Sequence, residues 1–388
     1  MFTHKNIKIL TWFNFLTDFK FYAPIAIIYF TRITGSYALG TSIFSIIAIS
    51  SAFLEVPTGI FSDYIGRKNT VILGSIASVF CVVLYAIGGS YWMLACGAFI
   101  EGLSRAFYSG NNDALLHDTL SDIGKRQEYH VYYGKTNSMF QIAGAAAALI
   151  GGFIATWSFP LLMWLSVAPQ IIGLFLSFGI VEPEKRQGSG NIYAHLGESI
   201  RYFIKNKKLR VLSLTNILGY ATGEASYQFQ AAFFNTLWPL WAIGLARTVS
   251  SIAAFFSFYT AGKFINKFKE IPVLIFGNLF GRFFNLIALI FVSVMSPILL
   301  SLSSLLFGTI TAARENLFQK EFTENQRATM GSLNSLASSI FFAIFSLGIG
   351  FFADRIGGAK ALIMINIIQF IPIFLYLKLR NYSKNEKI

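Results

Sequence analysis

The residues of this chain that could do chemistry are ionisable and amide side chains placed inside long apolar runs. Asp18 lies in the first run, Glu101 and Arg105 lie in the fourth, and Glu224 lies in the seventh. An ionisable side chain in hydrocarbon costs at least about 2.5–3.5 kcal/mol, so such residues face protein or water and are functional candidates. Each has polar neighbours three or four residues away, which places them on one face of a helix.

The first, fourth and seventh runs are therefore expected to form helices that each carry a polar stripe. Glu101 precedes Arg105 by four residues, which is the favourable order for an ion pair within a helix. Lys20 lies almost opposite Asp18 on its helix and needs a partner elsewhere. Purely structural pairing between helices is the alternative for every one of these charges. The functional candidates on these stripes are Asn14, Asp18, Tyr22, Glu101, Arg105, Tyr108, Asn112, Tyr220, Glu224, Tyr227 and Gln228.

The elements that position these residues are transmembrane helices. The 388-residue chain is 55% hydrophobic and 13% charged, whereas a soluble domain is roughly 25% charged. A soluble fold of this size could not cover its surface with so few charges, and a 16% share of aromatic residues excludes disorder. A spanning helix needs about 20 mostly apolar residues. We predict spans at 7–31, 37–59, 70–89, 91–116, 136–156, 159–181, 209–235, 238–262, 271–293, 297–315, 329–352 and 359–378.

The basic residues predict the orientation of these helices. If the N-terminus is cytoplasmic, most of the 31 Lys and Arg residues lie in inner segments, as the positive-inside rule requires. The rule explains the net charge of +13 without a nucleic-acid partner. We therefore expect a multi-pass protein of the plasma (cytoplasmic) membrane with both termini in the cytoplasm.

A polar stretch divides the chain into two halves of six spans. We predict an N-terminal bundle at 1–181, a cytoplasmic linker at 182–208 and a C-terminal bundle at 209–388. Within the linker, Ile192, Leu196, Ile200 and Phe203 fall at helical spacing. This spacing predicts an amphipathic helix that lies on the lipid surface or in solvent. Transporters are often built from such paired repeats.

The loop between the second and third spans carries the most specific motif. It has the sequence Gly59-Ile-Phe-Ser-Asp63-Tyr-Ile-Gly66-Arg67-Lys68 and is preceded by Glu55. Gly59 is expected to allow close helix packing, Gly66 to permit a tight turn, and Asp63 to cap the next helix or pair with a basic residue.

This segment resembles motif A of the major facilitator superfamily at all five defined positions, and residues 50–120 resemble a bacterial, drug-efflux-like group within it. The resemblance implies an all-α polytopic membrane protein with twelve transmembrane helices in two six-helix bundles. It also implies that the polar stripes of the first, fourth and seventh helices line one substrate cavity near the membrane midplane, and that the motif gates the cytoplasmic side. The gating residues would be Glu55, Gly59, Asp63, Gly66, Arg67 and Lys68.

The function implied by the resemblance is secondary active transport of a small organic molecule by alternating access, as proton-coupled efflux. Asp18 and Glu224 are the coupling candidates, one in each half. The antiporter motif C is incomplete, because Ala143, Ala147 and Ala148 stand where Gly, Gly and Pro belong. A uniporter or importer of a small metabolite is therefore the alternative, followed by a non-transporting receptor or scaffold.

The expected partners follow from this interpretation. They are a small-molecule substrate, a proton or other coupling ion and the lipid bilayer. We expect a monomer with no cofactor, no metal, no nucleic acid and no catalytic residues, since the sequence indicates a transporter and not an enzyme.

Overall fold

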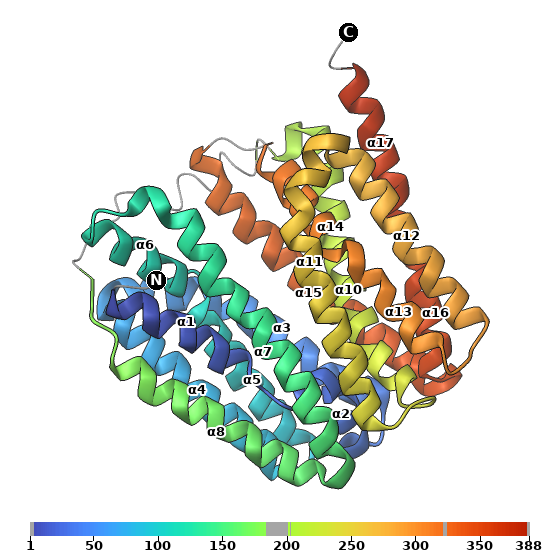
Figure 1. Cartoon of the computed structure of the whole chain (residues 1–388), viewed down its shortest axis with the longest axis horizontal. Coiled ribbons are helices and arrows are strands. Elements are labelled where there is room, and N and C mark those ends of the chain that lie inside the picture. Colours follow the sequence, from blue (N-terminus) through green and yellow to red (C-terminus); the bar gives the residue numbers. More distant parts are fainter. Residues whose placement is uncertain (1–3, 184–200, 202, 321–323, 386–388) are drawn as a thin grey trace. The chain divides into compact units, whose positions relative to one another are not determined.

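The computed structural model describes residues 4–183, 201, 203–320 and 324–385, and the regular elements in these ranges are helices (Figure 1). Nine of the described helices are long and apolar enough to cross a membrane. The predicted all-α architecture is confirmed. The predicted amphipathic helix and most of the 182–208 linker lie outside the described residues. The contacts divide the chain into two compact units, Met1–Gln187 with Pro239–Thr248, and Gly188–Trp238 with Val249–Ile388.

The first unit is built from helices that cover the first six predicted spans. Helix α5 packs against α3 and α4, α4 also packs against α8, and α1 packs against α7 and α8. Ile7, Leu10 and Phe13 of α1 are buried against Val71 and Leu115. The elements are α1 (Lys5–Asp18), η1 (Ala23–Ile25), α2 (Ala26–Thr34), α3 (Tyr37–Ile65), α4 (Arg67–Ile87), α5 (Tyr91–Tyr108), α6 (Asn111–Asp122), η2 (Arg126–Glu128), α7 (Tyr129–Trp157) and α8 (Phe159–Phe178).

The second unit is built in a similar way from the later helices. Helix α10 packs against α15 and α16, and α12 packs against α13 and α14. Leu209, Leu212, Leu274 and Tyr376 belong to its apolar core. The elements are α10 (Lys207–Phe234), α11 (Leu240–Phe268), of which the first residues belong to the first unit, α12 (Glu270–Ile290), α13 (Ser296–Leu302), η3 (Ser303–Leu306), α14 (Phe307–Gln319), α15 (Glu324–Ile356), α16 (Gly358–Ile368) and α17 (Ile371–Asn385).

Four predicted spans, at 7–31, 91–116, 297–315 and 359–378, each consist of more than one helical element and are interrupted. Pro24 follows the first break and cannot donate a helical hydrogen bond. Gly110, with φ of 68°, separates α5 from α6. In the tenth span, Ser303 donates to the Leu300 carbonyl and the chain tightens into a 3₁₀ turn. In the twelfth span, Pro372 follows the break.

The break in the first span is held by specific contacts. Gln170 of α8 donates from Nε2 to the carbonyl of Leu16, 3.0 Å away, which satisfies one of the free carbonyls at the end of α1. Gly151 of α7 lets the broken segment approach, because a Cβ at this position would lie 2.0 Å from the Phe21 carbonyl oxygen. The interruption therefore has partners on two neighbouring helices.

Candidate functional site

A buried carboxylate in the first unit collects hydrogen bonds from three elements. Glu101 of α5 is 4% exposed, and its Oε1 lies 3.2 Å from Nζ of Lys20, which follows the end of α1. Arg105 donates from Nη2 to the same oxygen at 2.9 Å, and Tyr85 of α4 donates from its hydroxyl to Oε2 at 2.9 Å. The predicted Glu101–Arg105 ion pair is confirmed. Lys20, which was expected to need a partner outside its own helix, pairs with Glu101.

Asp18 completes the charge balance of this cluster. It is the last residue of α1, its side chain is exposed, and within the described chain it forms no side-chain hydrogen bond or ion pair. Its carboxylate interacts electrostatically with Lys20, Arg105 and Glu101. Two cations thus face two carboxylates, of which Glu101 is fully engaged and Asp18 is not.

The other polar residues of the first unit mostly tie helices together. Asn14 donates from Nδ2 to the Thr136 carbonyl of α7 at 3.1 Å, and Tyr108 donates to the hydroxyl of Ser75 at 3.3 Å. Because the first and fourth spans are broken, Tyr22 and Asn112 do not continue the stripes of α1 and α5. The buried Tyr22 hydroxyl and Asn112 Oδ1 have no hydrogen-bond partner among the described residues.

The second unit presents its polar residues on α10 and between α12 and α16. Tyr220, Glu224 and Tyr227 are exposed, whereas Gln228 is buried.

A second polar cluster joins Arg282 and Asn285 of α12 to Asn366 of α16. Asn366 Oδ1 accepts from Arg282 Nη1 at 2.9 Å and from Asn285 Nδ2 at 3.0 Å.

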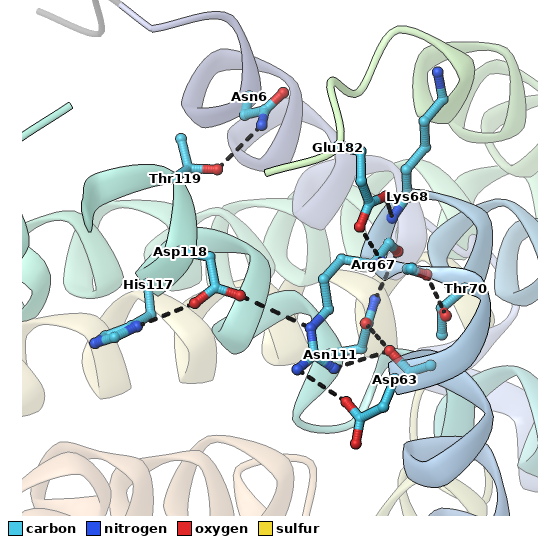
Figure 2. Close-up of polar contacts among 12 residues, drawn as sticks. Asn6, Asp63, Arg67, Lys68, Thr70, Asn111, His117, Asp118, Thr119 and Glu182 are labelled. Carbon is cyan, nitrogen blue, oxygen red and sulfur yellow. Dashed lines mark hydrogen bonds and ion pairs between the residues drawn. The ribbon is translucent and has the colours of Figure 1, made fainter. Parts of the chain in front are cut away.

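Arg67 organises the inner loop of the first unit (Figure 2). Its guanidinium lies 3.2 Å from Asp63 Oδ1 and 3.9 Å from Asp118 Oδ2, and it donates to the Ser62 hydroxyl at 2.9 Å. One side chain therefore links the end of α3 and the start of α4 to α6. Of the two roles expected for Asp63, pairing with a basic residue is confirmed.

Glu182, and not Asp63, caps the N-terminus of α4. Its Oε1 accepts from the backbone N–H of Arg67 at 2.7 Å, and its Oε2 accepts from that of Lys68 at 2.8 Å, as Figure 2 shows. A carboxylate there satisfies free N–H groups and complements the helix dipole. Asn6 positions the segment, because it exchanges two 2.8 Å hydrogen bonds with the backbone of Val181.

Two of the motif glycines differ in their surroundings. Gly66 has φ of 91°, and a Cβ on it would lie 2.7 Å from Glu182 Oε1. Apart from the backbone of its own helix and its chain neighbours, no described atom lies within 4 Å of the corresponding position at Gly59, so the expected close packing at Gly59 is not found. Glu55 accepts a hydrogen bond from the Ser109 hydroxyl at 2.7 Å.

Comparison with known proteins identifies the family. Residues 9–340 match the sequence model of the Major Facilitator Superfamily. The chain belongs to this superfamily. Solved transporter structures have the same fold as this chain. A mutant of the nucleoside transporter NupG superposes on it with a TM-score of 0.83, at 14% identity over 96% of this chain and 98% of that one. A D-xylose–proton symporter superposes with a TM-score of 0.75 at 11% identity over 97% of each chain. The twelve-helix fold in two bundles is thereby confirmed.

Three relatives match this chain over different shares of their own length. A Na⁺, Li⁺, K⁺/H⁺ antiporter of Planococcus maritimus is 25% identical over 45% of this chain and 41% of its own. An MFS-type efflux pump of Pseudozyma antarctica is 29% identical over 33% of this chain and 24% of its own. An uncharacterised MFS-type transporter of Methanocaldococcus jannaschii is 20% identical over 95% of both chains. This chain therefore spans less than half of the length of the first two of these relatives, and it belongs to a superfamily of membrane transporters.

We expect Gly66→Ala to destabilise the first unit, and Gly59→Ala to be neutral. The backbone of Gly66 is unfavourable for a side chain by about 1–3 kcal/mol, and a methyl group there would displace the Glu182 cap. Gly59 lies within α3 with open space around it, where Ala is tolerated. Thermal unfolding of the two purified variants in the same detergent measures the difference. Equal unfolding temperatures would contradict the role given to Gly66.

We expect Glu101→Gln to lower the free energy of unfolding by about 3 kcal/mol, because removing one partner of a buried ion pair leaves the other uncompensated. Asp18→Asn is the comparison and should cost less, because it removes a charge from the cluster but no side-chain hydrogen bond or ion pair within the described residues. Adding Lys20→Met to Glu101→Gln should restore part of the loss. If Asp18→Asn destabilises the protein as much as Glu101→Gln, the cluster is not held by Glu101.

Proposed function

We propose that this transporter exports a small organic molecule in exchange for protons, by alternating access. The observation that supports the proposal is the cluster of Lys20, Arg105, Glu101 and Asp18 at a break in a membrane-spanning helix. Broken helices provide binding sites in secondary transporters because their ends leave backbone groups free. In this cluster Glu101 is held by two ion pairs, whereas Asp18 interacts electrostatically with the same cations and forms no ion pair within the described residues.

The charge balance gives Asp18 a specific role in the proposal. With Asp18 ionised, two cations and two carboxylates balance, and the cluster carries no net charge. When Asp18 binds a proton, the cluster gains one positive charge in a region where uncompensated charge is costly. Protonation therefore favours a rearrangement that hydrates or neutralises Lys20 or Arg105. Such a link between protonation and conformation is what a proton-coupled carrier requires.

Glu224 is the second coupling candidate. It lies on the exposed face of α10 with Tyr220 and Tyr227, whose rings offer apolar surface together with hydroxyl groups. These side chains suit a small, partly apolar substrate. We therefore propose Tyr220, Glu224, Tyr227 and Gln228, with the polar residues of the first and fourth spans, as substrate contacts.

The direction of transport rests on similarity. The resemblance of residues 50–120 to efflux-like proteins and the names of two relatives favour export. The alternative is a uniporter or importer of a small metabolite. It is favoured by the replacement of motif C residues with Ala143, Ala147 and Ala148, which are buried. We further propose that the protein works as a monomer in the cytoplasmic membrane, with Asp63, Arg67 and Lys68 as part of a cytoplasmic gate.

Proteoliposomes with an imposed pH gradient test the proposal. A panel of small organic compounds is offered to vesicles that contain a pH-sensitive dye, and accumulation is measured for each compound that moves protons. We expect Asp18→Asn and Glu224→Gln to abolish accumulation driven by the gradient. Exchange of substrate without a gradient should persist, because the amide resembles the protonated acid.

Glu128→Gln is the matched control, since Glu128 is an exposed carboxylate paired with Lys125 far from the break. It should accumulate substrate as the unmodified protein does. If both Asp18→Asn and Glu224→Gln still concentrate substrate, neither residue couples transport to protons. If the unmodified protein transports a compound but ignores the pH gradient, the uniporter alternative replaces the proposal.

A further inference from the structure

The second unit contains an apolar groove of about 400 Å³ where α11, α12, η3 and α14 meet. Phe264 and Phe268 of α11 and Leu306 of η3 form part of its walls. Thr309 also lines the groove, but its hydroxyl donates to the carbonyl of Ser257 at 3.0 Å. The lining therefore offers hydrocarbon and aromatic surface and almost no hydrogen-bonding capacity. A ligand that fits this lining is a hydrocarbon chain.

Gly277 fixes the shape of this groove. A Cβ at Gly277 would lie 2.6 Å from Cγ1 of Ile310, so α12 and α14 approach closely at this point. Phe276, the neighbouring residue, is 66% exposed and also lines the groove. Apolar surface that is left without contacting atoms loses dispersion energy, and a flexible chain from the bilayer can supply those contacts.

Helix α11 carries two lysines in the same stretch as the two phenylalanines that line the groove. Lys267 Nζ lies 5.2 Å from the centre of the Phe268 ring, and Lys263 precedes it by one helical turn. Both are exposed, and neither forms an ion pair within the described residues. Glu270, the next carboxylate along the chain, forms an ion pair with Lys320 and accepts a hydrogen bond from Asn316 Nδ2 at 2.8 Å. The charge at the groove is therefore positive.

We propose that this groove binds one acyl chain of an anionic phospholipid, with the headgroup phosphate on Lys263 and Lys267. The α11–α12 connection lies on the side that the distribution of basic residues assigns to the cytoplasm. Anionic lipids are enriched in that leaflet, and each nearby Lys or Arg contributes about 1 kcal/mol to binding them. Hydrocarbon surface close to cations that form no ion pair within the described residues matches the two chemically different parts of such a lipid. This site is independent of the proposed proton coupling.

Native mass spectrometry of the full-length protein with phosphatidylglycerol or phosphatidylcholine tests the site. The unmodified protein should retain phosphatidylglycerol in preference to phosphatidylcholine. Lys263→Gln with Lys267→Gln should weaken phosphatidylglycerol binding by about tenfold or more, as expected for two lysines. Leu306→Trp, which fills the groove, should weaken it as well. Leu306→Phe serves the same purpose if the larger side chain prevents folding.

Lys378→Gln with Arg380→Gln is the matched control, because it removes two exposed cations from the same unit without touching the groove lining. This variant should retain the preference. An equal loss in the control would show nonspecific charge attraction and overturn the site. Equal retention of the two lipids by the unmodified protein would overturn the headgroup contact. Full binding in both groove-filling variants would overturn the acyl-chain contact.

Discussion

The buried Glu101 carboxylate is the interaction on which the arrangement of the first unit depends. A membrane-spanning segment that stops at Asp18 and resumes at η1 leaves a lysine and several backbone groups inside the apolar layer. Glu101 supplies the charge that makes Lys20 tolerable there, and Gln170 satisfies a free carbonyl of α1. Without these partners the break would expose polar groups to hydrocarbon at a cost of several kcal/mol. The cluster therefore keeps charged side chains within the membrane-spanning region, where one of them can bind a proton.

A second carboxylate performs a similar task at the inner loop of the same unit. Glu182 closes the start of α4, while Arg67 is shared between Asp63 and Asp118. The two clusters lie at different ends of α4, since Tyr85 reaches Glu101 from near its end and Arg67 begins it. Both ends of this helix are thus fixed by acidic side chains from other elements. Because α4 is fixed at both ends, protonation of a residue at the break in the first span would act on helices whose positions are well defined.

Much of this arrangement could be predicted from the sequence, and the rest depends on long-range contacts. Hydrophobic run length sets the number of spans, and the spacing of Glu101 and Arg105 predicts their ion pair. The break after Asp18 was not predicted, although Pro24 signals it, because the apolar composition continues across the interruption. Glu182, Gln170 and Asn366 were also not identified, since their partners lie far away in the sequence and no local pattern marks them.

Infrared difference spectroscopy tests the central claim most directly, because a band of a protonated carboxyl group can be assigned by substituting that group. The protein in lipid nanodiscs is titrated from high to low pH, and the bands of protonated carboxyl groups are followed. The account predicts a band that disappears in Asp18→Asn and persists in Glu101→Gln, since Glu101 stays ionised between Lys20 and Arg105. A band that persists in Asp18→Asn and disappears in Glu101→Gln would contradict it.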